Sequence, residues 1–498
     1  TLRTTLRTRF AHLARTHDRA AFGAQVDTAA AFTDRALALA RPGGITALVL
    51  PAKLWRSRAG GALRAHLVAH ATPLVVTDQG DDALGFEASV YPATLVARRH
   101  DAPRARHTAA DARTGTHTTT RTAPPTIPLT TTDGAAMHAT HTGTRAPVAP
   151  HDGTIVTAAA RDATGTLRTF RIPLHRLGAT TESHAPWLLA PHPVRAAADA
   201  LVAHAPRWPD APLPPPTLGV KTGHNAAFVL DTRDATPALR AHTRPALRGD
   251  AVTPWRHTPD GTLLLVPHDD DGALRTLPAD VARHLAPFTT ALRARTDLRP
   301  RDPWWTLFRT DLLARGGWRV VWADVGRSLR ATLLPPQSPT VPLNSCYGVR
   351  CTDPVDAHAL LALLNAPTTT ALLALVAEPA RGGFHRFLGF TVASLPLPPW
   401  HRARELLAPL GARARRGHPP DARTLHDATL AAYGARHADV APLLDWTGTH
   451  AALDPAHDTH AAHLAATAHD AVRRPAHAGA HDAAHVTTRP ARPTAHAS

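Results

Sequence analysis

ITALVLP at residues 45–51 decides the fold class of this chain of 498 residues. It is a continuous apolar run of strand length, which is typical of a strand buried on both faces of a sheet. TPLVVTD at 72–78 and VYPATLVARR at 90–99 are further strand candidates, and a helical pattern at 57–70 separates the first two strands. The turn at 85–87 is too short for a parallel crossover, so the last two strands should be antiparallel neighbours. The pattern predicts an α/β domain whose mostly parallel sheet ends in an antiparallel hairpin.

The pattern extends in both directions from this core. Residues 23–42 have apolar residues at helical spacing and end in a Pro-Gly-Gly turn, which predicts a helix before the first strand. Residues 101–185 lose periodicity, and either low complexity or a hairpin at 166–174 fits them. Short strands, such as 318–324 and 347–351, then alternate with turns. We divide the chain into an α/β part at 1–102, a low-complexity connector at 103–185, an α+β domain at 186–400, a helical extension at 401–450 and a disordered Ala/His-rich tail at 451–498.

Composition limits the classes of function. The net charge of +16 and the isoelectric point near 11.3 favour a polyanionic partner such as nucleic acid, although an arginine-rich coding bias explains them equally well. Cys346 and Cys351 are the only cysteines, too few for a disulfide framework or a zinc site, which predicts a reducing, cytoplasmic setting. No apolar run approaches the roughly 20 residues of a membrane span, and we expect no metal site and no membrane.

Three strings stand out from the Ala-, Arg- and Thr-rich background: VKTGHNAAFVLD at 220–231, PALRGDAVTPW at 245–255 and AEPARGGFHRF at 377–387. The first contains one of the two lysines of the chain, Lys221, and one of its three asparagines, Asn225. A lysine beside a glycine turn suits a phosphate, and an asparagine can pair with an adenine edge. The string therefore predicts DNA contact.

The other two strings place arginines beside glycines. Arg248 precedes Gly249, Arg381 precedes a Gly-Gly pair, and Arg386 follows that pair closely. An arginine on a flexible turn can approach a DNA backbone, although each alone is equally a solvated charge at a turn. Because Lys221 and these arginines all lie close to glycines in the sequence, we predict that they bind DNA together with Asn225.

Catalytic motifs are absent from the sequence: it has no phosphate-binding glycine loop, no HExxH and no nucleophile elbow. We therefore assign no catalytic residue. Phe86 lies on the turn that leads into the third strand. A phenylalanine there is either a core residue or a platform on which a base rotated out of the duplex can stack.

These strings resemble the adenine-specific DNA methyltransferases of restriction–modification systems, in the class with a C-terminal target-recognition domain. Residues 22–55 look like the stretch that follows the family's Asn-Pro-Pro-Tyr loop, and GFEASVYPATLV at 85–96 looks like a later motif. The resemblance implies that Phe86 stacks on the flipped adenine and that Phe32 lies beside the adenine ring of S-adenosylmethionine. It also implies that 1–102 is the C-terminal half of the methyltransferase catalytic domain and that 186–400 is the target-recognition domain, within a resemblance that extends over 186–446.

The intact family member would transfer a methyl group from S-adenosylmethionine to the exocyclic amine of adenine in double-stranded DNA. Its fold would be a doubly wound sheet ending in the antiparallel hairpin, followed by an α+β target-recognition domain. The family's glycine-rich cofactor loop and Asn-Pro-Pro-Tyr loop do not occur in this sequence. We therefore expect an N-terminally truncated enzyme that is inactive alone, or a split enzyme whose other chain or upstream segment supplies the missing half. The alternatives are a non-catalytic DNA-specificity subunit of a restriction–modification or phage-defence complex, and a nonspecific nucleic-acid-coating protein.

Overall fold

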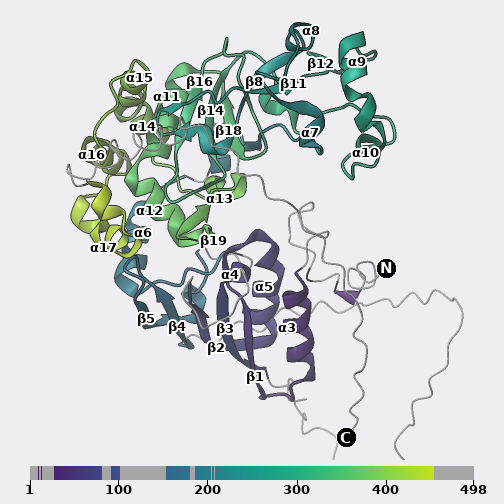
Figure 1. The fold of residues 1–498 in the computed structure, drawn as a ribbon. Helices are drawn as coiled ribbons and strands as arrows, with labels where there is room; N and C mark the ends of the chain where they lie inside the picture. Colours follow the sequence, from purple (N-terminus) through teal and green to yellow (C-terminus); the bar gives the residue numbers. More distant parts are fainter. Residues whose placement is uncertain are drawn as a thin grey trace, which may run out of the picture.

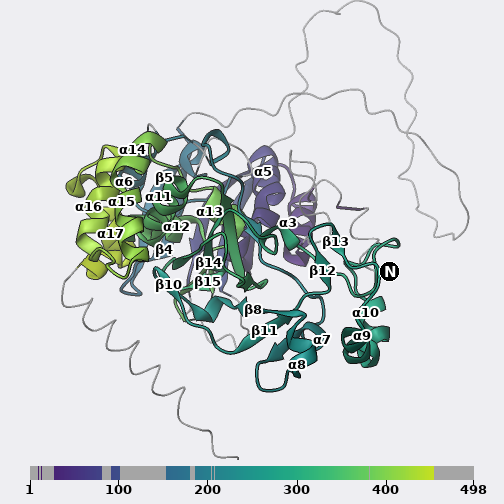
Figure 2. The ribbon, with the colours of Figure 1, turned by 90° about the horizontal axis from the view of Figure 1, so that it is seen from above.

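A computed structural model describes residues 9–10, 13, 27–80, 91–100, 153–179, 185–203, 205–206, 208–380 and 382–453. It has a smaller N-terminal part built on one sheet, and a larger C-terminal part built on several sheets and a group of helices (Figure 1). Figure 2 shows the helices of residues 400–447 gathered on one side of the C-terminal part, and the strands and short helices of residues 225–293 on the other.

The N-terminal part contains a five-stranded sheet in the order β1-β3-β2-β4-β5. Its strands are β1 (Ile45–Pro51), β2 (Ala71–Asp78), β3 (Pro92–Arg99), β4 (Ile155–Arg161) and β5 (Leu167–Pro173). The first three confirm the predicted strands, and β2 and β3 are antiparallel neighbours as expected. β5 lies where the sequence left a hairpin and low complexity as alternatives, and it pairs antiparallel with β4.

Helices follow from local sequence signals. α3 (Thr28–Leu39) begins at Asp27, whose carboxylate accepts a hydrogen bond from the backbone N–H of Ala29 at 2.9 Å. α4 (Lys53–Arg56), the 3₁₀ turn η1 (Arg58–Gly60) and α5 (Gly61–His70) connect β1 to β2. α3 and α5 lie on one side of the sheet (Figure 1), where Leu63 and Leu67 pack with Val76 and Leu95 in one core.

Two details of the sheet differ from the prediction. β1 is buried on one face only: its residues alternate between buried and exposed, and Ile45 and Val49 are exposed. The continuous apolar run therefore marks a strand whose second face lies open within the described residues. In addition, only the β2–β4 pairing is parallel, because β3 inserts between β1 and β2. The described sheet is thus mostly antiparallel.

The C-terminal part contains two four-stranded sheets, a three-stranded sheet and two hairpins. The four-stranded sheets have the orders β17-β8-β11-β7 and β16-β14-β18-β6, and the three-stranded sheet has the order β15-β20-β19. β14 and β18 confirm the strands expected near 318–324 and 347–351. The strands are β6 (Thr217–Leu218), β7 (Val229–Asp231), β8 (Thr243–Leu247), β9 (Val252–Thr253), β10 (Arg256–His257), β11 (Thr262–Leu265), β12 (His268–Asp269), β13 (Gly272–Ala273), β14 (Trp318–Ala323), β15 (Val325–Gly326), β16 (Ala331–Leu334), β17 (Val341–Pro342), β18 (Cys346–Cys351), β19 (Glu378–Ala380) and β20 (Phe384–Arg386).

Helices cover the second four-stranded sheet and form its core with it. Within the described residues, no single helix is long and apolar enough to span a membrane; only α11 (Pro354–Asn365) and α12 (Pro367–Val376) taken together, bent by 67° at their junction, reach that length and composition. Both are buried against the other helices of the core. The helices are α6 (His192–Val202), α7 (Asn225–Phe228), α8 (Pro237–Arg240), α9 (Ala279–Leu285), α10 (Thr289–Arg293), α11 (Pro354–Asn365), α12 (Pro367–Val376), α13 (Gly389–Ala393), α14 (Trp400–Leu406), α15 (Ala408–Arg415), α16 (Ala422–Tyr433) and α17 (His437–Thr447), with 3₁₀ turns η2 (Leu174–Arg176), η3 (Trp208–Asp210), η4 (Gly249–Ala251), η5 (Ala286–Phe288), η6 (Thr310–Leu312) and η7 (Thr449–Leu453).

The two parts meet where α4 approaches β19. The guanidinium of Arg56 forms a 2.9 Å ion pair with Asp78 and donates hydrogen bonds to the carbonyls of Ala374 and Ala377, at 3.5 Å and 3.3 Å. Both members of the ion pair are largely buried. Arg56 therefore connects the end of the first sheet to the end of α12 and to Ala377, the first residue of the third sequence string.

Candidate nucleic-acid interface

A short loop, Leu343–Cys346, brings the three sequence strings together, and we call it the hub loop. The N–H of Gly219, just before the first string, donates to the carbonyl of Cys346 at 2.9 Å. The N–H of Gly249, in the second string, donates to the Ser345 hydroxyl at 2.9 Å. Strings that are far apart in the sequence thus share one anchor.

The third string reaches the same loop through one residue. The N–H of Asp324 donates to the carbonyl of Ser345 at 3.0 Å, and the N–H of Phe387 donates to the carbonyl of Asp324 at 2.8 Å. The hydrogen bond from the Trp322 indole N–H to the Phe387 carbonyl, 2.9 Å long, is buried beside this connection. The predicted DNA-contacting segments therefore form one assembly.

Arg295 stabilises the turn at 221–225 through hydrogen bonds to backbone carbonyls. Gly223 has φ +69°, which lets the chain reverse between Lys221 and Asn225. The buried Arg295 donates hydrogen bonds to the carbonyls of Thr222 at 2.5 Å and Trp304 at 2.7 Å, and its guanidinium stacks on Phe308 at 4.7 Å. Burial lowers the pKa of Arg295, and Asp297 opposes that effect. The charge of this arginine is used to fix the turn, not to contact a ligand.

The two predicted side chains on this turn have different environments. The Nζ of Lys221 forms a 2.5 Å ion pair with Asp297, so it can reach a phosphate only by exchanging that partner. The Asn225 side chain is exposed at the first residue of α7, and its Oδ1 accepts a 2.6 Å hydrogen bond from the Thr222 hydroxyl. This hydrogen bond orients the amide group.

Arg248 and the β19–β20 hairpin supply the predicted arginines. Arg248 is exposed and lies 3.9 Å from Asp250. Arg386 is exposed on β20, opposite Glu378. Gly382 and Gly383 both have positive φ, which forms the turn of this hairpin, while Arg381 lies outside the described residues.

Buried titratable groups surround the base of this hairpin. Burial raises the pKa of Glu378, and the nearby positive charges, Arg386 first among them, oppose this shift. Burial likewise raises the pKa of Asp324 against the effect of Arg386. Burial lowers the pKa of His385 to about 4, so this imidazole is neutral near pH 7. The exposed positive charge of Arg386 therefore lies close to the largely buried side chains of Glu378 and Asp324.

Two side chains in this region were not predicted as site residues. Asn344 is exposed in the centre of the hub loop, and it is one of the three asparagines of the chain, so its rarity was an available signal. The Arg327 guanidinium lies over the Phe384 ring, 5.1 Å from its centroid. Arg327 had no such signal, because the contact joins residues 57 positions apart and depends on tertiary structure.

The two aromatic predictions lie in the N-terminal part. Phe32 is on α3 with its side chain pointing away from the core, and it is 64% exposed. Phe86 lies outside the described residues, so its predicted stacking role stays a prediction. On the same helix, the helix-capping Asp27 forms a 2.7 Å ion pair with Lys53.

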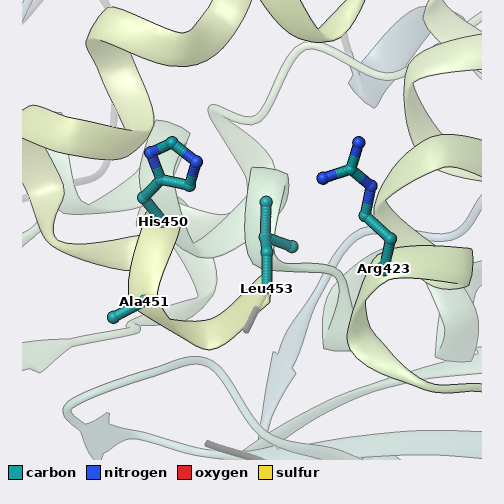
Figure 3. A pocket seen from close by; sticks show the side chains of 4 residues that line it. All are labelled: Arg423, His450, Ala451 and Leu453. Carbon is teal, nitrogen blue, oxygen red and sulfur yellow. The ribbon is translucent and has the colours of Figure 1, made fainter. Parts of the chain in front are cut away.

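The described residues contain no group of three or more His, Cys, Asp or Glu side chains that could hold a metal ion. A cavity of about 320 Å³ lies elsewhere, between α16 and η7, lined by Arg423, His450, Ala451 and Leu453 (Figure 3). Its two polar side chains have carboxylate partners, since Arg423 pairs with Asp427 and His450 with Asp445. The arrangement around the hub loop thus presents exposed amide and guanidinium groups that can form hydrogen bonds.

Solved structures of other proteins include a similar fold. The type IIL restriction–modification enzyme MmeI, solved in complex with DNA, superposes with a TM-score of 0.50 and 9% identity over 90% of this chain. The chain is similar in fold to a restriction–modification enzyme. It spans 55% of the length of MmeI.

A second similar structure is the type IIG restriction endonuclease BpuSI, with 10% identity, a TM-score of 0.31, and coverage of 89% of this chain and 52% of BpuSI. No protein-family model matches the sequence, and no curated protein matches it either.

Proposed function

We propose that this chain is the DNA-reading part of a restriction–modification enzyme. The observation that carries the proposal is the hub loop, to which three segments with exposed polar and basic groups are hydrogen-bonded. The similarity in fold to a restriction–modification enzyme solved with DNA supports it. Amides and guanidiniums held on turns are the groups that proteins use to contact base edges and phosphates.

Each group has a distinct role in this proposal. The exposed amides of Asn225 and Asn344 read base edges in the major groove, where an amide can form two hydrogen bonds to adenine. Lys221, Arg248 and Arg386, with Arg381, contact phosphates and fix the register of the duplex. Lys221 exchanges Asp297 for phosphate when DNA binds, and the Asp297 carboxylate, which is 42% exposed, is then hydrated by water.

The whole enzyme, in this proposal, methylates the exocyclic amine of adenine in double-stranded DNA with S-adenosylmethionine, and Phe86 stacks on the flipped base. The described residues do not fit a complete cofactor site. Phe32 offers the cofactor a ring that is 64% exposed, and its described surroundings have no glycine-rich loop for the methionine end. We therefore assign this chain base recognition and support of the flipped base, and no chemical step.

The test is binding of duplex DNA by the full chain, measured by fluorescence anisotropy across a salt series with random-sequence competitor. A preferred sequence is first selected from a randomised duplex pool. Asn225→Ala should weaken binding to that sequence by about 1–3 kcal/mol and relax the preference at one position. Lys221→Ala should weaken all sequences alike and make the salt dependence less steep by about one ion.

The matched control for Lys221→Ala is Arg436→Ala. Arg436 is also an exposed cation paired with one aspartate, Asp439, but it lies on the helical extension. The Arg436→Ala substitution should leave both the DNA affinity and its salt dependence unchanged. Binding that is blind to sequence, or equal losses in the two variants, would favour a nonspecific nucleic-acid-coating protein and refute the proposal.

A further inference from the structure

Four exposed arginines form a group away from the hub loop, which we call the α15 patch. Arg413 and Arg415 lie in the last turn of α15, and Arg416 follows as the residue that caps the helix. Arg256 is exposed on β10. The guanidinium of Arg415 lies over the ring of Trp318, 5.1 Å from its centroid, which fixes the end of the helix on the start of β14.

A glycine turn at the end of α15 brings the helix and β10 together. The N–H of Gly417 donates to the carbonyl of Ala414 at 3.0 Å. The N–H of His418 donates to the carbonyl of Arg413 at 3.1 Å, and the two hydrogen bonds form a Schellman motif. Gly417 has φ +97°, which the motif needs. A Cβ at Gly417 would be 3.8 Å from Nη2 of Arg256, so Arg256 lies directly beside the end of α15.

The four guanidiniums of the α15 patch have no carboxylate partner. Among the described residues, none of them forms an ion pair or donates a side-chain hydrogen bond. The negative end of the helix dipole stabilises cations here by only about 0.3–1 kcal/mol, while like charges three residues apart repel. A bound anion would offset this repulsion. By contrast, other exposed arginines each pair with an aspartate: Arg168, Arg176, Arg233, Arg283, Arg423 and Arg436.

The surroundings of the α15 patch favour phosphate over a protein surface. Neither α15 nor the β9–β10 hairpin has a large apolar side chain that is exposed. Protein interfaces usually have an apolar centre, whereas guanidiniums bind phosphate through paired N–H groups. Asp250 lies before the hairpin, 3.9 Å from Arg248, at the end next to the hub loop. The patch therefore fits the backbone of a nucleic acid.

The second sequence string connects the α15 patch with the hub loop. At one end of this segment, the N–H of Gly249 donates to the Ser345 hydroxyl. At the other end, the N–H of Trp255 donates to the carbonyl of Ala331 at 2.8 Å. Trp255 has φ +69°, which is unusual for a residue other than glycine, and this hydrogen bond helps to hold the reversal that leads into Arg256.

The distance between the patch and the hub loop follows from β14. Ala323, at the end of this strand, pairs with Cys346 of the hub loop, and Trp318, at its start, lies beneath Arg415. Five strand steps of about 3.3 Å separate the two ends by about 17 Å. At about 3.4 Å per base pair, this distance corresponds to about five base pairs of duplex.

We propose that the α15 patch binds the phosphate backbone of the duplex about five base pairs outside the recognition sequence. The inference rests on the proposed function and deepens it: the hub loop supplies the contacts to bases, and the patch supplies affinity that does not depend on sequence. The contact is confined to one flank of the recognition sequence, because the patch lies toward one end of β14 only.

The test is fluorescence anisotropy with the full chain and duplexes that contain the selected sequence. Each flank is about four or about twelve base pairs long, shorter or longer than the distance to the patch, in all four combinations. The variant combines Arg413→Gln with Arg416→Gln, and its thermal unfolding is measured beside that of the unchanged chain. The matched control combines Arg423→Gln with Arg436→Gln, which removes the same charge from the same helical extension, but from arginines paired with aspartates.

The loss of affinity should depend on one flank. With the long flank on the side of the patch, the double variant should bind about thirtyfold more weakly at about 0.15 M salt, because two phosphate contacts are lost. The slope of the logarithm of affinity against the logarithm of salt concentration should become less steep by about 1.8. With that flank shortened, the double variant and the unchanged chain should bind alike. The control should keep both the affinity and the slope on every duplex.

Three results would overturn the inference: equal affinity of the double variant and the unchanged chain on every duplex, a loss that is the same for long and short flanks, and an equal loss in the control. The first is expected if the patch binds an acidic protein. Asn225→Ala separates this inference from the proposed function. A chain that prefers its sequence but is insensitive to flank length refutes only the role of the patch, whereas a chain without any sequence preference refutes the proposed function.

Discussion

Replacing Gly249 by alanine is the most direct test of the hub loop. A Cβ at this position would lie 2.5 Å from the backbone carbonyl oxygen of Ser345 and 3.5 Å from the Cβ of Ala323. The first distance is shorter than real Cβ contacts, and the obstacle is backbone, which cannot turn away as a flexible side chain can. The chain before η4 must therefore separate from the hub loop.

The magnitude follows from overpacking of a close-packed interior, which destabilises by about 1–3 kcal/mol. Movement also weakens the 2.9 Å hydrogen bond from Gly249 to the Ser345 hydroxyl, adding about 1 kcal/mol. We expect Gly249→Ala to lower the free energy of unfolding by about 3 kcal/mol. Because Arg248 is the neighbouring residue, DNA affinity should fall as well.

The assay is urea unfolding followed by tryptophan fluorescence, with DNA affinity measured below the transition. Gly261→Ala is the control: Gly261 has φ +82° on a turn near β11, and the nearest atom to its Cβ is 3.6 Å away. It should lower the free energy of unfolding by about 1 kcal/mol, from backbone strain alone, and leave DNA affinity unchanged. A Gly249→Ala variant as stable as Gly261→Ala and unaltered in DNA affinity would show that the hub loop does not couple the strings.

Two further predictions concern buried cations and histidines. Arg295→Lys should lower DNA affinity nearly as much as Arg295→Ala, because lysine cannot bind the carbonyls of Thr222 and Trp304 at the same time. In both variants the backbone amides at 221–228 should exchange hydrogen faster, and DNA affinity is measured beside this exchange. A lysine variant with the affinity of the unchanged chain would contradict the prediction. The buried His426, 2.8 Å from the Thr368 hydroxyl, has its pKa lowered to about 4 by burial and by His437. Its folded pKa lies below the ordinary 6.5, so its contribution to stability is present above pH 6.5 and is lost as the pH falls toward 4. Unfolding at stepped pH should show this loss, His426→Gln should reduce it, and an unaltered pH slope would refute it.

The sequence predicted the strands and helices that have strong periodic patterns. ITALVLP, TPLVVTD and VYPATLVARR became β1, β2 and β3, and the short link between the last two required their antiparallel pairing. Rare residues helped to identify the three strings, because a lysine or an asparagine is unusual in this composition. Local pattern and composition are properties of the sequence, so these features were accessible without a structure.

Long-range contacts decided the rest. Nothing in the sequence pairs Gly249 with Ser345 or Arg295 with Thr222, because those partners lie 96 and 73 residues apart. The same holds for the open face of the sheet: an apolar strand reads identically whether its second face is covered or open. The sequence by itself determined the strands with strong apolar patterns, and it predicted which residues contact DNA. Tertiary structure alone decided that the three strings connect to one loop and that, within the described residues, one face of ITALVLP is uncovered, because both depend on packing between segments distant in the chain.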